Sequence, residues 1–268
     1  MPRFTTGLAL LLPTLLCAGG LSAQGKGFAY APGAHHYRVT STVTRTQEAG
    51  GQKAALKIDT DQRVTVTVTR HSADTLDFAV RLDSTSITSE PQVQLPDLSK
   101  YIGLNVSGAM SPGGKVFAMK ASLDSASDPA VQGLVEGLGR FLVPFPAGTR
   151  VGSTWADTNS TAPDSSGQGV TSKTITTSRV LGDTVYAGQR AWRVARTVGT
   201  TLDGSTTEGG QQLSVTGKGN GSGMFYVSHA GVYLGSTMKQ NTSMTISGAG
   251  GMTVPITQTG VSKIELMP

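Results

Sequence analysis

Four histidines are the first residues in this sequence that could do chemistry, and their spacing argues against a metal site. His35 and His36 are adjacent, while His71 and His229 each stand alone. Neighbouring side chains in an extended strand point to opposite faces, so the adjacent pair cannot chelate one ion together. The sequence has no zinc-motif spacing of histidines, and its single cysteine is Cys17. We therefore expect no metal and no cofactor.

Two serines stand where a nucleophile could be placed. Ser111 precedes a Pro-Gly-Gly turn, and Ser228 precedes His229. Residues adjacent along a chain rarely reach the geometry of a catalytic pair, and the G-x-S-x-G motif is absent. We expect both hydroxyls to bond the backbone of a turn.

The remaining candidates for a chemical site are the carboxylates and one glycine-rich stretch. Asp59 and Asp61 could share a strand face, as could Arg81 and Asp83, and solvated strand charges explain them better than a glycosidase pair. "GKGNGSG" (217–223) lacks the G-K-[ST] ending of a phosphate loop, and no helix is expected after it. We predict a flexible turn there, and a protein that is not an enzyme.

The elements that would position these residues are mostly strands. In "DQRVTVTVTRH" the residues Val64, Val66 and Val68 face one way and the intervening threonines face the other. Such alternation is typical of an antiparallel sheet with one face on a core. The same pattern recurs around 37–43 and 76–82, and further strands are expected near 170–182, 190–202, 222–228, 231–246 and 252–267. Turns are predicted between them at 181–183, 202–205, 217–223 and 247–251.

One segment, 127–146, breaks this pattern and predicts an amphipathic helix over about 129–142. Asp128 can cap its N-terminus, Pro129 suits the first helical position, and two further prolines end it. Its glycines weaken it, so it must pack its apolar stripe on a sheet. The stripe comprises Val131, Leu134, Val135, Leu138 and Leu142.

Two stretches look alike in the two halves of the chain. "SPGGKVFAMK" (111–120) aligns with "SHAGVYLGST" (228–237) at an offset of 117 residues, which matches Ser111 with Ser228 and Gly114 with Gly231. Two similar halves, about 35–122 and 150–267, joined by the segment 127–146, are one interpretation. Glycines that recur at turns for ordinary reasons are the other.

The first 23 residues resemble a signal peptide, with Arg3, an apolar stretch and "LSA" before Gln24. Residues 24–268 then form a single β-rich domain. The alternative is an outer-membrane lipoprotein acylated at Cys17, but Leu16 is too large for the position before such a cysteine. The apolar stretch is too short for a transmembrane span, so we expect an exported protein, periplasmic or extracellular, without a span in its mature chain.

The composition narrows the class of partner. The formal charge is +5, only 15% of residues are charged and 6% are aromatic, and the basic residues are scattered. The sequence shows no basic stripe for nucleic acid and no polybasic membrane patch. This suits a β protein whose surface is rich in Ser, Thr, Gly and Gln.

The stretches "YIGLNVSGAMSPGGKVFAM" (101–119) and "FPAGTRVGSTWAD" (145–157) fit a known layout. With the order of elements, they resemble exported bacterial β-rich proteins of unknown function and the lipoprotein-carrier fold of bacterial envelopes. That resemblance implies an unclosed barrel with helices in its open side and a hollow for acyl chains. No functional residue transfers with it.

The predicted fold class is therefore mainly β, a strongly curved antiparallel sheet or incomplete barrel with one amphipathic helix packed on it. The predicted function is non-catalytic binding of an apolar or amphiphilic ligand, such as a lipid or acyl chain, in the cell envelope. The alternatives are a structural or protein-interaction module of the envelope, and a hydrolase if a polar cleft gathers acids. The predicted ligand-lining residues are Val66, Phe78, Val80, Leu134, Leu138 and Trp192.

Overall fold

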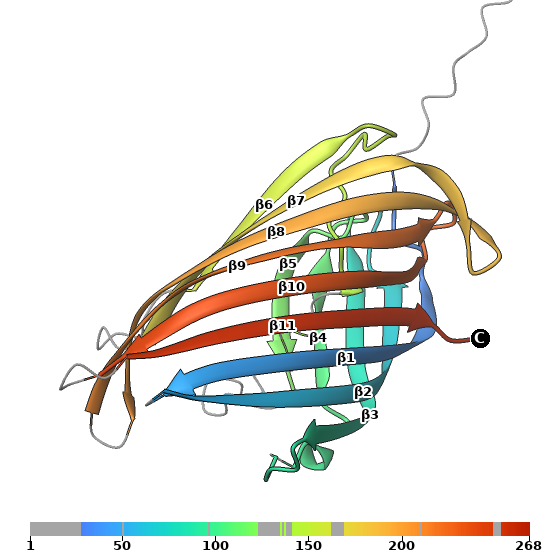
Figure 1. Ribbon diagram of the computed structural model, residues 1–268. Helices are drawn as coiled ribbons and strands as arrows, with labels where there is room; N and C mark the ends of the chain where they lie inside the picture. Colours follow the sequence, from blue (N-terminus) through green and yellow to red (C-terminus); the bar gives the residue numbers. More distant parts are fainter. Residues whose placement is uncertain are drawn as a thin grey trace, which may run out of the picture.

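The computed structural model describes residues 28–49, 51–95, 97–122, 135, 137, 141–161, 169–208, 211–248 and 253–268. These residues form one sheet of eleven antiparallel strands, shown in Figure 1. The strands are β1 (Gly33–Ala49), β2 (Gln52–Arg70), β3 (Leu76–Glu90), β4 (Asn105–Met110), β5 (Val116–Ala121), β6 (Thr154–Thr161), β7 (Gly169–Tyr186), β8 (Gln189–Glu208), β9 (Gln211–Ser228), β10 (Tyr233–Ser247) and β11 (Thr253–Leu266). A short 3₁₀ helix, η1 (Ser99–Tyr101), lies between β3 and β4.

The first and last strands lie together in the middle of the sheet. The strand order is β5-β4-β3-β2-β1-β11-β10-β9-β8-β7-β6, so each half of the chain runs outward as neighbouring antiparallel strands. Short connections suffice for such neighbours, whereas the β1–β11 pair joins the two ends of the chain. Its register runs from Tyr37 opposite Leu266 to Gln47 opposite Ile256. The edges of the sheet are β5 and β6.

The sheet curls so that its two arms share one core. Val66, Val80 and Val106 on β2–β4 belong to the same buried cluster as Val194 and Phe225 on β8 and β9. Strands β1, β11 and β10 separate these groups within the sheet. A flat sheet would hold the two groups apart, so the sheet must be strongly curved, as Figure 1 shows. The prediction of a mainly β, curved and unclosed antiparallel sheet is confirmed.

The predicted helix over 129–142 falls almost wholly outside the described residues. Val135 and Gly137 have helical conformation, and Val135 packs against the core. The segment that follows is non-helical from Leu142 to Phe145 and has its apolar side chains buried. Within the described ranges, no helix has the length and apolar character needed to cross a membrane.

Three of the predicted turns lie inside strands. Residues 181–183 belong to β7, 202–205 to β8 and 217–223 to β9. Gly182 marks a register shift between β7 and β8, and Gly204 lies so close to the backbone of Gly169 that a side chain would not fit. Glycine marks bulges and close backbone approaches in strands as well as turns, and this ambiguity explains the wrong predictions.

The β4–β5 turn and the β9–β10 turn have the same internal hydrogen bonds. In the first, the Gly114 amide donates to the Ser111 carbonyl and the Lys115 amide to the Ser111 hydroxyl. In the second, the amides of Gly231 and Val232 donate to the carbonyl and hydroxyl of Ser228. The prediction that both serines are turn residues is confirmed.

Candidate functional site on the inner face of the sheet

Strand register assigns every strand residue to one of two faces. The face that carries Tyr37 is called the inner face, and it includes Val64 on β2 and Leu266 on β11, which pair with Tyr37. On β11 the side chains alternate between this partly covered face and a more exposed outer face. The curl of the sheet therefore makes the inner face concave, because that face carries the core.

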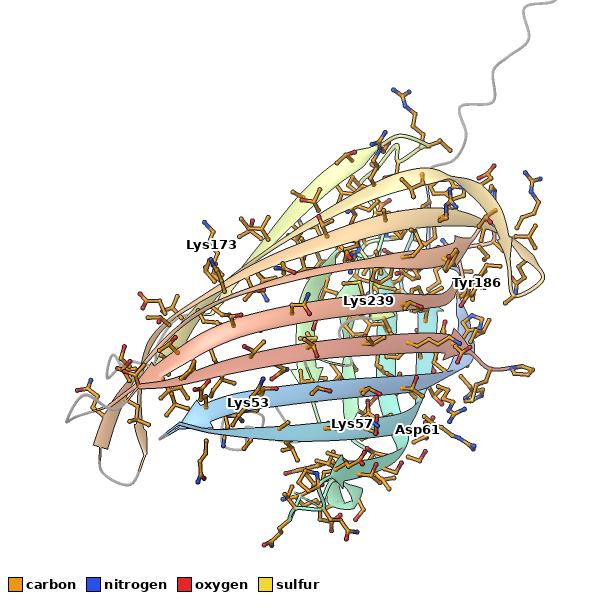
Figure 2. All side chains as sticks on the ribbon, in the orientation of Figure 1. Lys53, Lys57, Asp61, Lys173, Tyr186 and Lys239 are labelled. Atoms are coloured by element: carbon orange, nitrogen blue, oxygen red, sulfur yellow. The ribbon has the colours of Figure 1, made fainter. Side chains whose placement is uncertain are left out.

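Charged side chains gather on the outer face. By register, the labelled residues Lys53, Lys57, Asp61, Lys173 and Lys239 in Figure 2 all occupy outer positions. Arg38 donates three hydrogen bonds to the Asp61 carboxylate, the shortest at 2.6 Å, and Lys57 pairs with Asp59 at 2.8 Å. Hydrogen bonds from these cations hold the pKa values of Asp59 and Asp61 below their usual range. Asp59 and Asp61 thus share a face, as predicted, in exposed ion pairs that contribute little stability.

The inner face changes character along the strands. Near Tyr37 it is the packed core, and at the far end Leu213, Val215 and Ile256 form a second buried patch. Between them the inner positions carry mostly uncharged polar side chains beside aliphatic ones, and Arg45 on β1 and Asp157 on β6 are exposed charged residues on this face. The polar members, nearly all partly exposed, are Ser41, Thr60, Thr174, Thr176, Thr200, Gln240, Thr242, Gln258 and Ser262. The aliphatic members, also partly exposed, include Val43, Ile58, Val198, Leu202, Met244 and Ile246.

Four glycines, at positions 217, 219, 221 and 223, occupy consecutive inner positions of β9. A Cβ atom on Gly219 would lie 2.9 Å from the Thr242 hydroxyl, and one on Gly221 would lie 2.9 Å from the Lys239 carbonyl. Both neighbours belong to β10. The glycines therefore let β9 and β10 bend sharply toward the inner face, where side chains would collide. For this reason residues 217–223, for which the sequence predicted a turn, belong to strand β9.

Arg196 lies on the inner face of β8, where the packed core meets the polar stretch. Its Nε donates to the Ser178 hydroxyl at 3.3 Å, and its guanidinium lies 4.2 Å from the centre of the Phe225 ring. Burial lowers the pKa of Arg196. Among the described residues no carboxylate forms an ion pair with it. The site thus contains a largely buried cation without a described counter-ion.

Three buried tyrosines lie in this region: the charge of Arg196 interacts with Tyr30 and Tyr233, and Tyr37 contacts Tyr233. The Tyr37 hydroxyl donates to the Tyr233 carbonyl at 2.7 Å, and the Tyr233 hydroxyl donates to Ser236 at 2.6 Å. The Tyr30 hydroxyl accepts a hydrogen bond from the Val143 amide at 2.8 Å. Burial raises the pKa of all three well above that of a free tyrosine, so they stay neutral hydrogen-bonding groups.

The histidines lie apart from one another. By register His35 takes an inner position and His36 an outer one, as predicted, and His36 contacts the Thr65 hydroxyl. His71 contacts Asp77 at 3.0 Å, and His229 contacts Asp183 at 3.0 Å. Both pairs are exposed, and burial lowers the pKa of His35. No group of three metal-binding side chains occurs in the described part of the chain.

The predicted ligand-lining residues fall into two groups. Val66, Phe78 and Val80 are buried in the core, and Trp192 packs against it, partly exposed. Leu134 and Leu138 lie outside the described residues. Whether any of the six touches a ligand stays a prediction.

Sequence reasoning missed Arg196, although a signal was present. In "WRVARTV" the alternation that places Trp192 and Val194 on one face also places Arg196 there. A charge in the apolar phase of a strand indicates either a buried partner or a binding role. The inner-face glycines of β9 follow the same period of two.

No protein-family model and no curated protein matches this sequence. Among solved structures, DynF from the dynemicin biosynthesis pathway of Micromonospora chersina is 11% identical, with a TM-score of 0.25 over 91% of this chain and 85% of that one. An outer membrane channel from Pseudomonas putida is 8% identical, with a TM-score of 0.21 over 90% and 98%. A domain assigned to outer membrane lipoprotein sorting in Vibrio parahaemolyticus is 9% identical, with a TM-score of 0.20 over 86% and 83%. These weak resemblances to β-rich, mostly envelope proteins carry no inference about ligand or activity.

Proposed function

We propose that this chain is an exported, non-catalytic protein that binds an amphiphilic molecule, such as a lipid or acyl chain, on the inner face of its sheet. One observation carries the proposal. Beyond the packed core the concave inner face stays partly exposed, and it mixes aliphatic side chains such as Val198 and Leu202 with hydroxyl groups such as Thr200. Apolar surface with a few polar groups on a concave face is the usual lining of a small-molecule site.

The chemistry of the rest of the described chain supports binding without catalysis. The serines singled out as nucleophiles bond the backbone of turns, through the Lys115 and Val232 amides. The histidine–aspartate contacts of His71 and His229 are exposed. Neither arrangement supplies a nucleophile with an oriented base beside it.

Titration of lipid-stripped protein with an environment-sensitive fatty-acid probe tests the proposal. We expect saturable binding that unlabelled fatty acid reverses. Val198→Asp places a charge on the partly exposed aliphatic part of the inner face and should weaken binding by about tenfold or more. Thr197→Asp is the matched control, since Thr197 is exposed on the outer face of the same strand. Binding that is not saturable, or that both variants weaken equally, would overturn the proposal.

A protein-interaction module remains the second candidate, because edge strand β5 exposes large apolar side chains. Phe117 is 59% exposed and Met119 is 49% exposed. An unpaired edge of this kind can accept a strand from another protein. A photo-crosslinker at position 117 should then capture an envelope protein in cells. A crosslinker in place of Val261, which is exposed in the middle of the sheet, is the control.

A further inference from the structure

We propose that Arg196 binds the anionic headgroup of the amphiphile, a carboxylate or a phosphate, while the apolar chain lies along the inner face of β8. This inference rests on the proposed function and specifies the ligand and the contact. It starts from the charge of Arg196, because no described carboxylate pairs with this guanidinium. A charge removed from water without a counter-ion is strongly unfavourable, and an anionic ligand would compensate it.

The described surroundings of Arg196 engage only part of its guanidinium. Among the described residues its one hydrogen bond runs from Nε to the Ser178 hydroxyl, and its central carbon lies 4.2 Å from the centre of the Phe225 ring. The side chain is partly exposed. The outer nitrogens of a guanidinium form a planar fork that matches the oxygens of a carboxylate or phosphate.

The register neighbours of Arg196 are small and uncharged, and the Met238 side chain fills the space beside Gly223. These neighbours across the strands are Ser178 on β7 and Gly223 on β9. The carboxylate whose charge acts on Arg196 is Asp157, an exposed residue at an inner position of edge strand β6, and the two form no ion pair. An anion at the exposed part of Arg196 would therefore displace no described ion pair.

The order of side chains along β8 matches that of an amphiphile, with the cation of Arg196 at one end and aliphatic side chains beyond it. Val198 and Leu202 follow Arg196 on the inner face of β8, both partly exposed. Strand residues rise about 3.3 Å each, so Leu202 lies about 20 Å from Arg196 along the strand. A cation at one end of a partly exposed aliphatic row suits a ligand with an anionic head and an extended apolar tail.

Calorimetric titration of lipid-stripped protein with dodecanoate, dodecyl phosphate and dodecanol tests the assignment. The three probes share one chain and differ only in the headgroup. We expect at least one anionic probe to bind about tenfold to a hundredfold more tightly than dodecanol, as a charge-assisted contact predicts. Tighter binding of dodecanoate would indicate a fatty acid, and tighter binding of dodecyl phosphate a phospholipid headgroup.

Arg196→Gln should abolish this preference, because it weakens binding of the anionic probes far more than binding of dodecanol. Arg196→Lys keeps the charge without the planar fork and should retain part of the preference, which provides a test if the glutamine variant folds poorly. Arg193→Gln on the exposed outer face of β8 should retain all of it. Equal binding of the three probes, or equal loss for dodecanol and dodecanoate in Arg196→Gln, would overturn the assignment and leave the proposed function standing. Absence of saturable binding by all three probes would overturn both.

Discussion

Gly114 and Gly231 lie in two different turns that hold the same short segment of the chain. The Tyr30 amide donates to the carbonyl of Pro112, two residues before Gly114, at 2.8 Å, and the Ala31 amide donates to the Gly231 carbonyl at 3.1 Å. Successive amides of an extended segment point in opposite directions, so the two turns lie on either side of it. The two stretches that align in the sequence thus meet in space at residues 29–31.

Alanine at either glycine should destabilise the protein. Both residues have left-handed backbone, with φ of +86° at Gly114 and +87° at Gly231. An added Cβ would collide with the Tyr30 ring in the first case and with the Ala29 carbonyl in the second. We expect each variant to lower the free energy of unfolding by about 2 to 4 kcal/mol in urea denaturation.

Gly188→Ala separates backbone strain from collision in that experiment. Gly188 has φ of +74°, but nothing lies within 4 Å of the Cβ position. It should cost only about 1 kcal/mol, the strain of the left-handed conformation. Similar losses in all three variants would show that the two turns do not clamp residues 29–31.

Tyr30→Phe should lower the free energy of unfolding by about 1 to 3 kcal/mol, because it leaves the buried Val143 amide without its hydroxyl acceptor. Thermal or urea denaturation measures the loss. Tyr226→Phe is the control: its ring stacks on Tyr186 at 3.9 Å, a contact that phenylalanine retains. If Tyr30→Phe is as stable as this control, the hydrogen bond between the Tyr30 hydroxyl and the 141–145 segment does not stabilise the fold.

Stability should fall steeply in alkali. Burial raises the pKa values of Tyr30, Tyr37 and Tyr233, so the folded state keeps protons that the unfolded state releases above about pH 10. The contribution of these tyrosines to the free energy of unfolding is therefore complete below about pH 10 and is lost as the pH rises further. Three such groups give a slope approaching about 4 kcal/mol per pH unit.

Urea denaturation between about pH 8 and about pH 11.5, with tyrosinate absorbance followed in parallel, measures this slope. Tyr37→Phe removes one of the three groups and should reduce the slope by about one third. A free energy of unfolding that stays constant through this range would contradict the burial of the tyrosine hydroxyls.

Gly223→Ala should cost about 2 to 3 kcal/mol, because the added Cβ would collide with the Thr237 backbone and the Met238 side chain on β10. Gly199→Ala on the adjacent strand β8 has nothing within 4 Å of the new atom. It should be neutral or slightly stabilising, since alanine restricts the unfolded chain. Comparison of the two urea midpoints tests whether the inner-face glycines permit the bend between β9 and β10. Equal midpoints would contradict that role.

The period of two in the sequence predicted the strands, their faces and the antiparallel sheet. It placed Val64, Val66 and Val68 on one side, and all three are buried. Alternation is a local property of a strand, so the residues themselves determine it. The turn glycines at 114 and 231 could also be predicted from the sequence, because a left-handed backbone is a local requirement.

Pairing and curvature were decided by tertiary structure. Nothing in the local pattern of β1 states that it pairs with β11, or that the sheet bends until Val66 and Val194 share a core. Glycine marks turns at positions 114 and 231, whereas the alternating glycines of β9 relieve crowding inside a curved strand. Arg196 was visible as a charge on the apolar side of β8. Its burial beside Phe225 without a described counter-ion depends on which strands the curl of the sheet brings around it.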